Sequence, residues 1–241
     1  MTTIRKASTK SARAVDAAEA LAWLKRQGTQ KNIDGMARYG IPSQNALGVT
    51  VGATKAYAKQ IGRSHTLALG LWKSGYYEAR TLAAFVDEPE SLGVRQMNAW
   101  ASEFDSWAIC DTVCFHLFDK TELAWGRVHA WASDRAEFKK RASFALLWGL
   151  SVHAKGSSDD DFLGCLPLIE EAAKDERDYV KKGVDMALRA VGKRNAALRG
   201  AAESVARRLS LSKVGAQAWV GKHSLRELAS AKVKARASRR G

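Results

Sequence analysis

Hydrophobic residues along most of this chain recur three and four positions apart, a spacing that predicts α-helices. The pattern is clear in five stretches of the N-terminal half, which are separated by short segments rich in Gly, Ser or Asp. These stretches cover residues 14–26, 66–72, 78–86, 94–104 and 107–118. The one strand-like stretch, residues 47–51, is too short and too isolated to support a sheet. We therefore predict an all-α protein.

Two stretches that lie 42 positions apart repeat the same pattern. Residues 138–146 and 180–188 each combine an apolar helical stripe with a Lys-Lys pair at the same place in the repeat. Repeats of this length are typical of stacked helical arrays, in which each repeat packs on its neighbours. The pattern predicts an antiparallel array of roughly a dozen helices with capping segments at both ends. The Lys pairs would lie on one surface of this array.

The array is predicted to form a single domain over residues 13–230. Residues 1–12 are polar and basic, and residues 231–241 have no apolar periodicity that could be buried. We expect a flexible basic N-terminal segment and a disordered basic C-terminal tail, either of which could add affinity for phosphates without sequence preference.

The chain is strongly basic, with a formal net charge of +14. Thirteen Lys and Arg but only two acidic residues lie in residues 191–241, so this last stretch carries +11 of that charge. Basic surfaces of this kind attract phosphates and other polyanions. An excess of solvated lysine in an ordinary soluble protein is the alternative explanation.

No apolar run approaches the roughly 18 residues of a membrane-spanning helix, and the N-terminus lacks the apolar core of a signal peptide. We expect a cytoplasmic protein that does not engage membranes. Three cysteines, an odd number, fit a reducing compartment without a disulfide framework. Cys110, Cys114 and His116 lack an evident fourth ligand, so no metal site is predicted. Tryptophans 72, 100, 125, 131 and 148 lie in apolar-periodic segments and are expected in the core.

Several motifs occur in the order seen in a known family. Residues 48–59, 69–80 and 105–111 resemble the HEAT-like DNA alkylation repair family of 3-methyladenine and 7-methylguanine DNA glycosylases. The resemblance continues through Lys140-Arg141-Ala142 and Lys181-Lys182-Gly183-Val184, and covers about residues 40–211.

This resemblance implies an α-α superhelix, a HEAT- or armadillo-like solenoid, that is C-shaped and grips duplex DNA on a concave basic face. It implies cleavage of the N-glycosidic bond of positively charged alkylpurines, in at least some members without a deep pocket for the base. No metal or organic cofactor is expected. We expect a monomer that associates with alkylated duplex DNA, and so with the nucleoid.

The family's site residues fall on Trp107, Asp111 and Arg141. The first two are four positions apart, so on a helix they project from one face. The resemblance implies that Asp111 is the catalytic carboxylate, which stabilises the cationic sugar and positions water. Trp107 would attract the cationic lesion and Arg141 would hold a phosphate. The plainer alternatives are a core Trp and a solvated ion pair.

A second alignment is possible, because Cys110-Asp111-Thr112-Val113-Cys114 also fits the family's motif three residues later. The catalytic position would then be Cys114, which lacks a fixed negative charge at neutral pH, and activity would be impaired. Met186 occupies the place where active members carry a cleft-lining Trp. Trp148 lies seven residues after Arg141, and so on the same helical face, which makes it the candidate replacement for that aromatic ring.

Further contacts with DNA are predicted where basic residues recur at the repeat phase or lie in turns. Lys140 and Lys182 come from the two Lys-Lys pairs, and Lys193 and Arg194 lie in a predicted turn between helices. These residues would contact the DNA backbone beside Arg141.

Three functions fit these observations. We favour an alkylpurine DNA glycosylase. The alternative is a noncatalytic HEAT-repeat protein that binds branched, damaged or ordinary nucleic acid on the same basic face. A protein-binding solenoid is the third, and it differs from the others in that its affinity should depend little on salt.

Overall fold

The computed structural model describes residues 15–230. The predicted N-terminal segment, residues 1–12, and the predicted tail, residues 231–241, lie outside these described residues. Within them the chain forms fourteen α-helices and three 3-10 helices, with no strand. The predicted all-α fold is confirmed. The α-helices are α1 (Ala17–Gln27), α2 (Gln30–Met36), α3 (Val51–Ile61), α4 (His65–Lys73), α5 (Tyr77–Val86), α6 (Val94–Ser102), α7 (Trp107–His116), α8 (Ala124–Trp131), α9 (Glu137–His153), α10 (Asp159–Leu163), α11 (Leu166–Ala172), α12 (Asp178–Gly192), α13 (Ala196–Ser210) and α14 (Gly215–Leu228).

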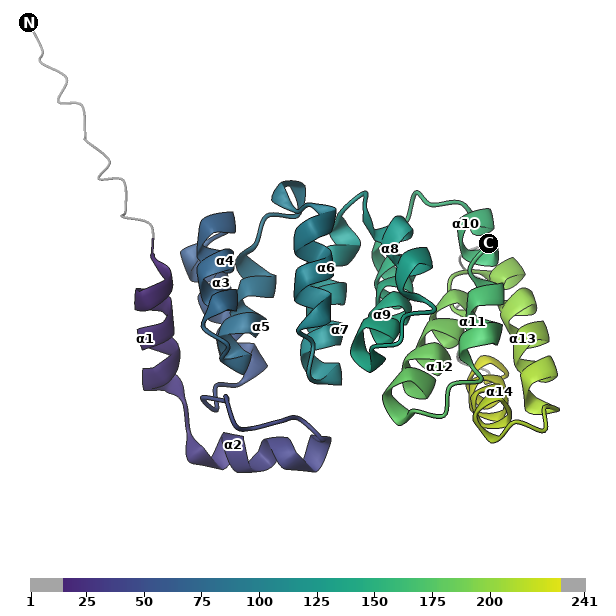
Figure 1. Cartoon of the computed structure of the whole chain (residues 1–241). Coiled ribbons are helices and arrows are strands. Elements are labelled where there is room, and N and C mark those ends of the chain that lie inside the picture. Colours follow the sequence, from purple (N-terminus) through teal and green to yellow (C-terminus); the bar gives the residue numbers. More distant parts are fainter. Residues whose placement is uncertain (1–14, 231–241) are drawn as a thin grey trace, which may run out of the picture.

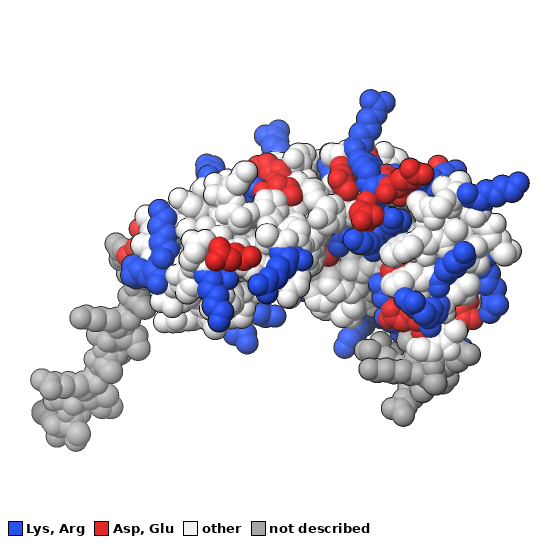
Figure 2. Space-filling model, turned by 90° about the horizontal axis from the view of Figure 1, so that it is seen from below, with Lys and Arg blue, Asp and Glu red and all other residues white. Residues whose placement is uncertain are grey.

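Six of these helices form a continuous row, in which α3, α5, α7, α9, α12 and α14 each pack on the next. The remaining helices cover this row: α4 packs on α5, α8 on α9, and both α11 and α13 on α12. Figure 1 shows the helices standing side by side, with α2 lying across one end of them. Seen from below in Figure 2, the array curves into an arch. The most extensive helix contacts are thus between near neighbours, as the repeat predicted.

The five helices predicted in the N-terminal half are confirmed, with ends that differ by no more than three residues. Side-chain caps explain where several of them begin. Asp16 forms a capping box with Glu19 at the start of α1, and Ser64 and Ser106 accept backbone N–H groups at the starts of α4 and α7. Each cap satisfies a donor that the first helical turn would otherwise leave unpaired.

The two repeated stretches lie on α9 and α12, which are neighbours in the continuous row. Arg141 and Gly183 occupy the same place in the two repeats, and their positions meet in the structure. A Cβ on Gly183 would lie 3.2 Å from Cγ of Arg141. The glycine therefore lets α12 approach the arginine of the preceding repeat closely.

The core contains three of the five tryptophans predicted there, and Trp148 is half-buried. Trp72 and Trp100 stack with ring centres 4.0 Å apart, and the Trp131 indole donates to Asn98 at 2.9 Å. All three are buried, whereas Trp125 is half-buried and meets Phe162 edge-on.

The segment before α3, which looked strand-like in sequence, is an extended loop. The buried Glu78 carboxylate accepts three backbone N–H groups from it, those of Leu47, Gly48 and Val49, at 2.7, 2.7 and 3.2 Å. Gly48 has φ +81°, and a Cβ there would lie 2.1 Å from the carbonyl oxygen of Thr29. Glu78 and Gly48 therefore fix the path by which α2 reaches the end of the array.

Candidate nucleic-acid interface

The predicted carboxylate and arginine meet across two neighbouring helices of the continuous row. Asp111 projects from α7, and its two oxygens accept hydrogen bonds from Nε and Nη2 of Arg141 on α9, at 2.8 and 2.7 Å. The Arg141 Nη1 group donates to the carbonyl oxygen of Tyr179 on α12, at 2.7 Å. Three consecutive helices therefore converge on one guanidinium.

Asp111 is ionised in this arrangement, because both of its oxygens act as acceptors. Burial raises the pKa of Asp111, while the Arg141 guanidinium opposes that rise by favouring the charged form. The Asp111 side chain is 14% exposed and that of Arg141 is 6% exposed. The three hydrogen bonds use three of the five N–H groups of Arg141, which leaves two others.

Trp107 lies one turn before Asp111 at the start of α7 and is half-buried. Its indole N–H donates to the carbonyl oxygen of Tyr39 at 2.8 Å. Gly40, the residue after Tyr39, accepts a hydrogen bond at its carbonyl oxygen from the Tyr179 hydroxyl, at 3.4 Å. The segment after α2 thus rests against α7 and α12, on either side of α9.

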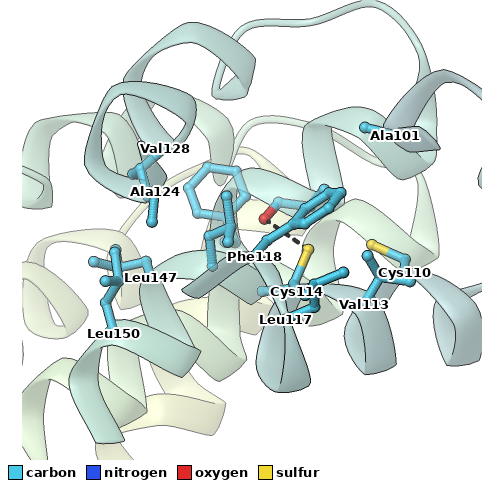
Figure 3. Packing of buried hydrophobic residues seen from close by; sticks show 14 of the residues in the cluster. Ala101, Cys110, Val113, Cys114, Leu117, Phe118, Ala124, Val128, Leu147 and Leu150 are labelled. Carbon is cyan, nitrogen blue, oxygen red and sulfur yellow. Dashed lines mark hydrogen bonds between the residues drawn. The ribbon is translucent and has the colours of Figure 1, made fainter. Parts of the chain in front are cut away.

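Cys114, the alternative catalytic position, is fully buried. Its thiol donates to the carbonyl oxygen of Ala142 at 3.6 Å, the bond drawn as a dashed line in Figure 3. Phe118, Val113 and Leu117 surround it in the apolar cluster of that view. Burial raises the pKa of Cys114 well above that of a free thiol, so the side chain is neutral. Asp111, not Cys114, is therefore the residue beside Arg141.

Trp148 and Met186, which sequence reasoning linked, line the same pocket. It has a volume of about 340 Å³ between α9 and α12, and Lys193 lines it as well. Trp148 also stacks on Phe115 with ring centres 4.2 Å apart. The structure therefore brings Lys193 to the predicted Trp148–Met186 pair, with Trp148 about two helical turns from Arg141.

The predicted basic contacts differ in how far they are already engaged. Lys140 pairs with Asp175 at 3.0 Å and is mostly buried. Arg194 donates to the carbonyl oxygens of Ser151, Ala154 and Ser157, and so caps the end of α9. Lys193 pairs with Glu227.

Lys182 is the most accessible of the four predicted contacts, with a side chain that is 53% exposed. Its partner Asp178 lies 3.5 Å away and is itself exposed, so the pair is weak. Figure 2 shows Lys and Arg spread over both limbs of the arch, with Asp and Glu interspersed. Fewer of the four basic residues predicted to contact DNA are therefore accessible than the sequence suggested.

Two site residues were missed in the sequence. Tyr39 is an exposed aromatic residue, 68% exposed, whose carbonyl holds Trp107. Tyr179 supplies the carbonyl that fixes Arg141. Neither belongs to a motif, and Tyr39 reaches the site only through a contact between residues 68 positions apart.

None of the helices within residues 15–230 is long and apolar enough to cross a membrane. In the same part of the chain, no group of three or more His, Cys, Asp or Glu side chains is placed to hold a metal ion.

Comparison with known proteins gives the fold and the family. The chain superimposes on a solved structure with a TM-score of 0.73 and 19% identity, covering 88% of this chain and 95% of that one. That structure is described as "a new family of proteins related to the HEAT-like repeat DNA glycosylases with affinity for branched DNA structures". The likeness identifies the array as the predicted HEAT-like repeat fold.

A search of curated proteins finds no significant match. The sequence model of the family described as "DNA alkylation repair enzyme" matches residues 20–209. Because this match spans most of the chain, the protein belongs to the DNA alkylation repair enzyme family.

Proposed function

We propose that this protein binds alkylated duplex DNA and excises positively charged alkylpurines, such as 3-methyladenine and 7-methylguanine, by hydrolysing the N-glycosidic bond. The observation that carries the proposal is the ionised Asp111 beside the half-exposed Trp107, paired with Arg141. Family membership supports it.

The proposed hydrolysis requires few catalytic groups from the protein. An alkylated purine leaves as a neutral base when the C1′–N bond breaks, and the bonding electron pair goes with the base. Positive charge then develops on the sugar, which a nearby carboxylate stabilises more strongly than it does the intact nucleotide. Water adds at C1′ and loses a proton, completing the hydrolysis. Asp111 has the charge for this role, and the indole face of Trp107 would attract the cationic base.

In this proposal Arg141 has two parts. It holds the Asp111 carboxylate in place with two hydrogen bonds, and its remaining N–H groups contact a phosphate beside the lesion. Lys182 adds a phosphate contact one helix further along. The proposal places the lesion against α7 and α9, with the duplex along the continuous row.

Three observations favour a second candidate, a noncatalytic DNA-binding protein. Met186 stands where active members carry a Trp, and Asp111 is already bonded to Arg141 through both oxygens. The solved structure of the same fold is described by its affinity for branched DNA. A protein of this kind would bind DNA through the same surface but would not cleave the N-glycosidic bond.

The two candidates separate in one experiment. Release of 3-methyladenine and 7-methylguanine from methylated duplex DNA is measured for the wild type, Asp111→Asn and Cys114→Ala, with duplex binding recorded for each. We expect excision by the wild type and by Cys114→Ala, and at least a hundredfold loss in Asp111→Asn.

Because Asp111→Asn breaks a buried ion pair, which can cost about 3–5 kcal/mol, its melting temperature is measured as well. Asp111→Asn/Arg141→Gln removes both charges and serves as a second variant. Duplex binding without excision by the wild type would establish the noncatalytic candidate. Failure to bind duplex DNA would exclude the glycosylase, and failure to bind branched DNA as well would exclude both candidates.

A further inference from the structure

A line of aromatic side chains crosses the continuous row of helices beside the proposed lesion site. Phe85 on α5 meets His116 on α7, with ring centres 5.0 Å apart. His116 meets Phe115 at 5.3 Å, and Phe115 stacks on Trp148 of α9 at 4.2 Å. All four rings are half-buried, so each is held firmly and still presents an edge or face to solvent. We call these four residues the aromatic track.

Two residues of the aromatic track lie on the same helices as the Asp111–Arg141 pair, a few residues further along each. Phe115 follows Asp111 by four residues on α7, and Trp148 follows Arg141 by seven on α9. At 1.5 Å per residue these offsets are about 6 and 10 Å along the helices. They correspond to about two to three nucleotides of a strand with a 3.4 Å rise.

A basic pocket closes the α3 end of the aromatic track. Its volume is about 280 Å³, and it is lined by Lys55, Lys59 and Arg63 together with Phe85 and His116, without an acidic residue. Burial and the nearby Lys55, Lys120 and His153 charges lower the pKa of His116 to about 4. His116 is therefore a neutral ring at pH 7, and the pocket's positive charge comes from Lys and Arg.

The α12 end of the aromatic track opens into the pocket that Trp148 shares with Met186. Trp148 stacks on Phe115 and also lines this pocket. Arg189 and Lys193 line it too, but Glu227 pairs with both of them. The two ends thus differ: the α3 end is lined by cations without an acidic residue, whereas the α12 end combines apolar side chains with cations that Glu227 already pairs.

We propose that the aromatic track binds unpaired nucleotides of a DNA strand that continues from the duplex, with bases against Phe115 and Trp148 and phosphates at Lys55 and Lys59. Stacking suits any base, because every base has a π-face. Interhelical spacings of about 8–10 Å between α5 and α12 give the track room for several nucleotides. The inference rests on the proposed DNA binding, and it is independent of excision.

The test compares two DNA ligands of the same duplex sequence, one blunt and one with a single-stranded extension of about six nucleotides, by fluorescence anisotropy. We expect the extension to tighten binding by the wild type about tenfold. Trp148→Ala and the surface variant Lys55→Gln/Lys59→Gln should each bring that ratio to within about twofold of one. Trp148→Phe, which keeps a ring, should retain most of it.

Two matched controls isolate the aromatic track. Trp219→Ala removes another partly exposed tryptophan, on α14, and Lys213→Gln/Lys222→Gln removes two other exposed lysines. Neither should change the ratio. Lys55 and Lys59 are exposed, so their variant tests the proposal even if Trp148→Ala fails to fold.

Blunt duplex that binds as tightly as the extended ligand in the wild type would overturn the proposal, while leaving the proposed DNA binding intact. Equal loss of the ratio in the control variants would overturn it too. Suppose that polyglutamate abolishes the extra affinity for the extended ligand and that Trp148→Ala leaves this affinity unchanged. The surface would then bind an acidic protein instead. Absence of any duplex binding would count against the proposed function itself.

Discussion

At the scale of single residues, the site depends on a close approach that one glycine permits. Gly183 on α12 lies against Arg141, where a Cβ would sit 3.2 Å from Cγ. The Arg141 side chain can reach the Tyr179 carbonyl on α12 only while α12 stays this near. The identity of residue 183 therefore bears on how the Arg141 guanidinium is held.

Replacing this glycine gives a test of the packing. Gly183→Ala and Gly200→Ala each add a methyl group within a helix, and Gly200 has open space around that position. Alanine should raise the free energy of unfolding by about 0.5–1 kcal/mol at Gly200, and strain against Arg141 should cancel that gain at Gly183. Chemical denaturation measures both. An equal increase in the free energy of unfolding at the two sites would show that the Arg141 side chain can move away from the added methyl group without strain.

At the scale of elements, the loop before α3 is built around one buried carboxylate. Glu78 pairs with three backbone N–H groups that no helix satisfies. This loop sets where α2 and the following Tyr39 segment lie, and so where Trp107 finds its hydrogen-bond partner. A residue on α5 thus helps to shape a site on α7.

Glu78→Gln is expected to lower the free energy of unfolding by about 2–3 kcal/mol, because an amide cannot accept all three hydrogen bonds and its NH₂ group faces donors. Glu103→Gln is the control, since that carboxylate is 47% exposed and its pair with Arg80 should contribute less than about 1 kcal/mol. Thermal or urea unfolding compares them. Equal effects would mean that the loop draws its stability from elsewhere.

At the scale of the whole molecule, the positive charge is concentrated outside the array. Nine of the Lys and Arg residues, and no Asp or Glu, lie in residues 1–14 and 231–241. The array itself, residues 15–230, therefore carries only +5 of the net +14. Some of its acidic residues also pair with basic ones, as Asp175 does with Lys140.

Affinity for duplex DNA should accordingly fall steeply with salt. If about four phosphates are contacted, raising salt from about 50 to 200 mM should weaken binding by about a hundredfold. A chain ending at Ser230 lacks five of the positive charges and should show a shallower slope. Anisotropy titrations at several salt concentrations measure both. A change below about threefold in the full chain would indicate an apolar interface instead.

The sequence predicted the regular parts of this protein well. Helical periodicity located five helices to within three residues, and the 42-residue repeat identified α9 and α12 as equivalent neighbours. These features are local or periodic, so they are written in consecutive residues. The sequence also named Asp111 and Arg141 as site residues, but it did not predict that they pair with each other.

What the sequence alone determined, then, is an all-α repeat array with a net positive charge and a set of candidate residues on its helices. Only the tertiary structure showed that Asp111, and not Cys114, contacts Arg141. Cys114 lies three residues later on the same helix, so its side chain points in another direction and is buried in the core. The tertiary structure also decided which cations are already paired, and it brought Tyr39 to Trp107 and Phe115 to Trp148. Those contacts join helices far apart in the chain, where packing rather than local periodicity sets the distance.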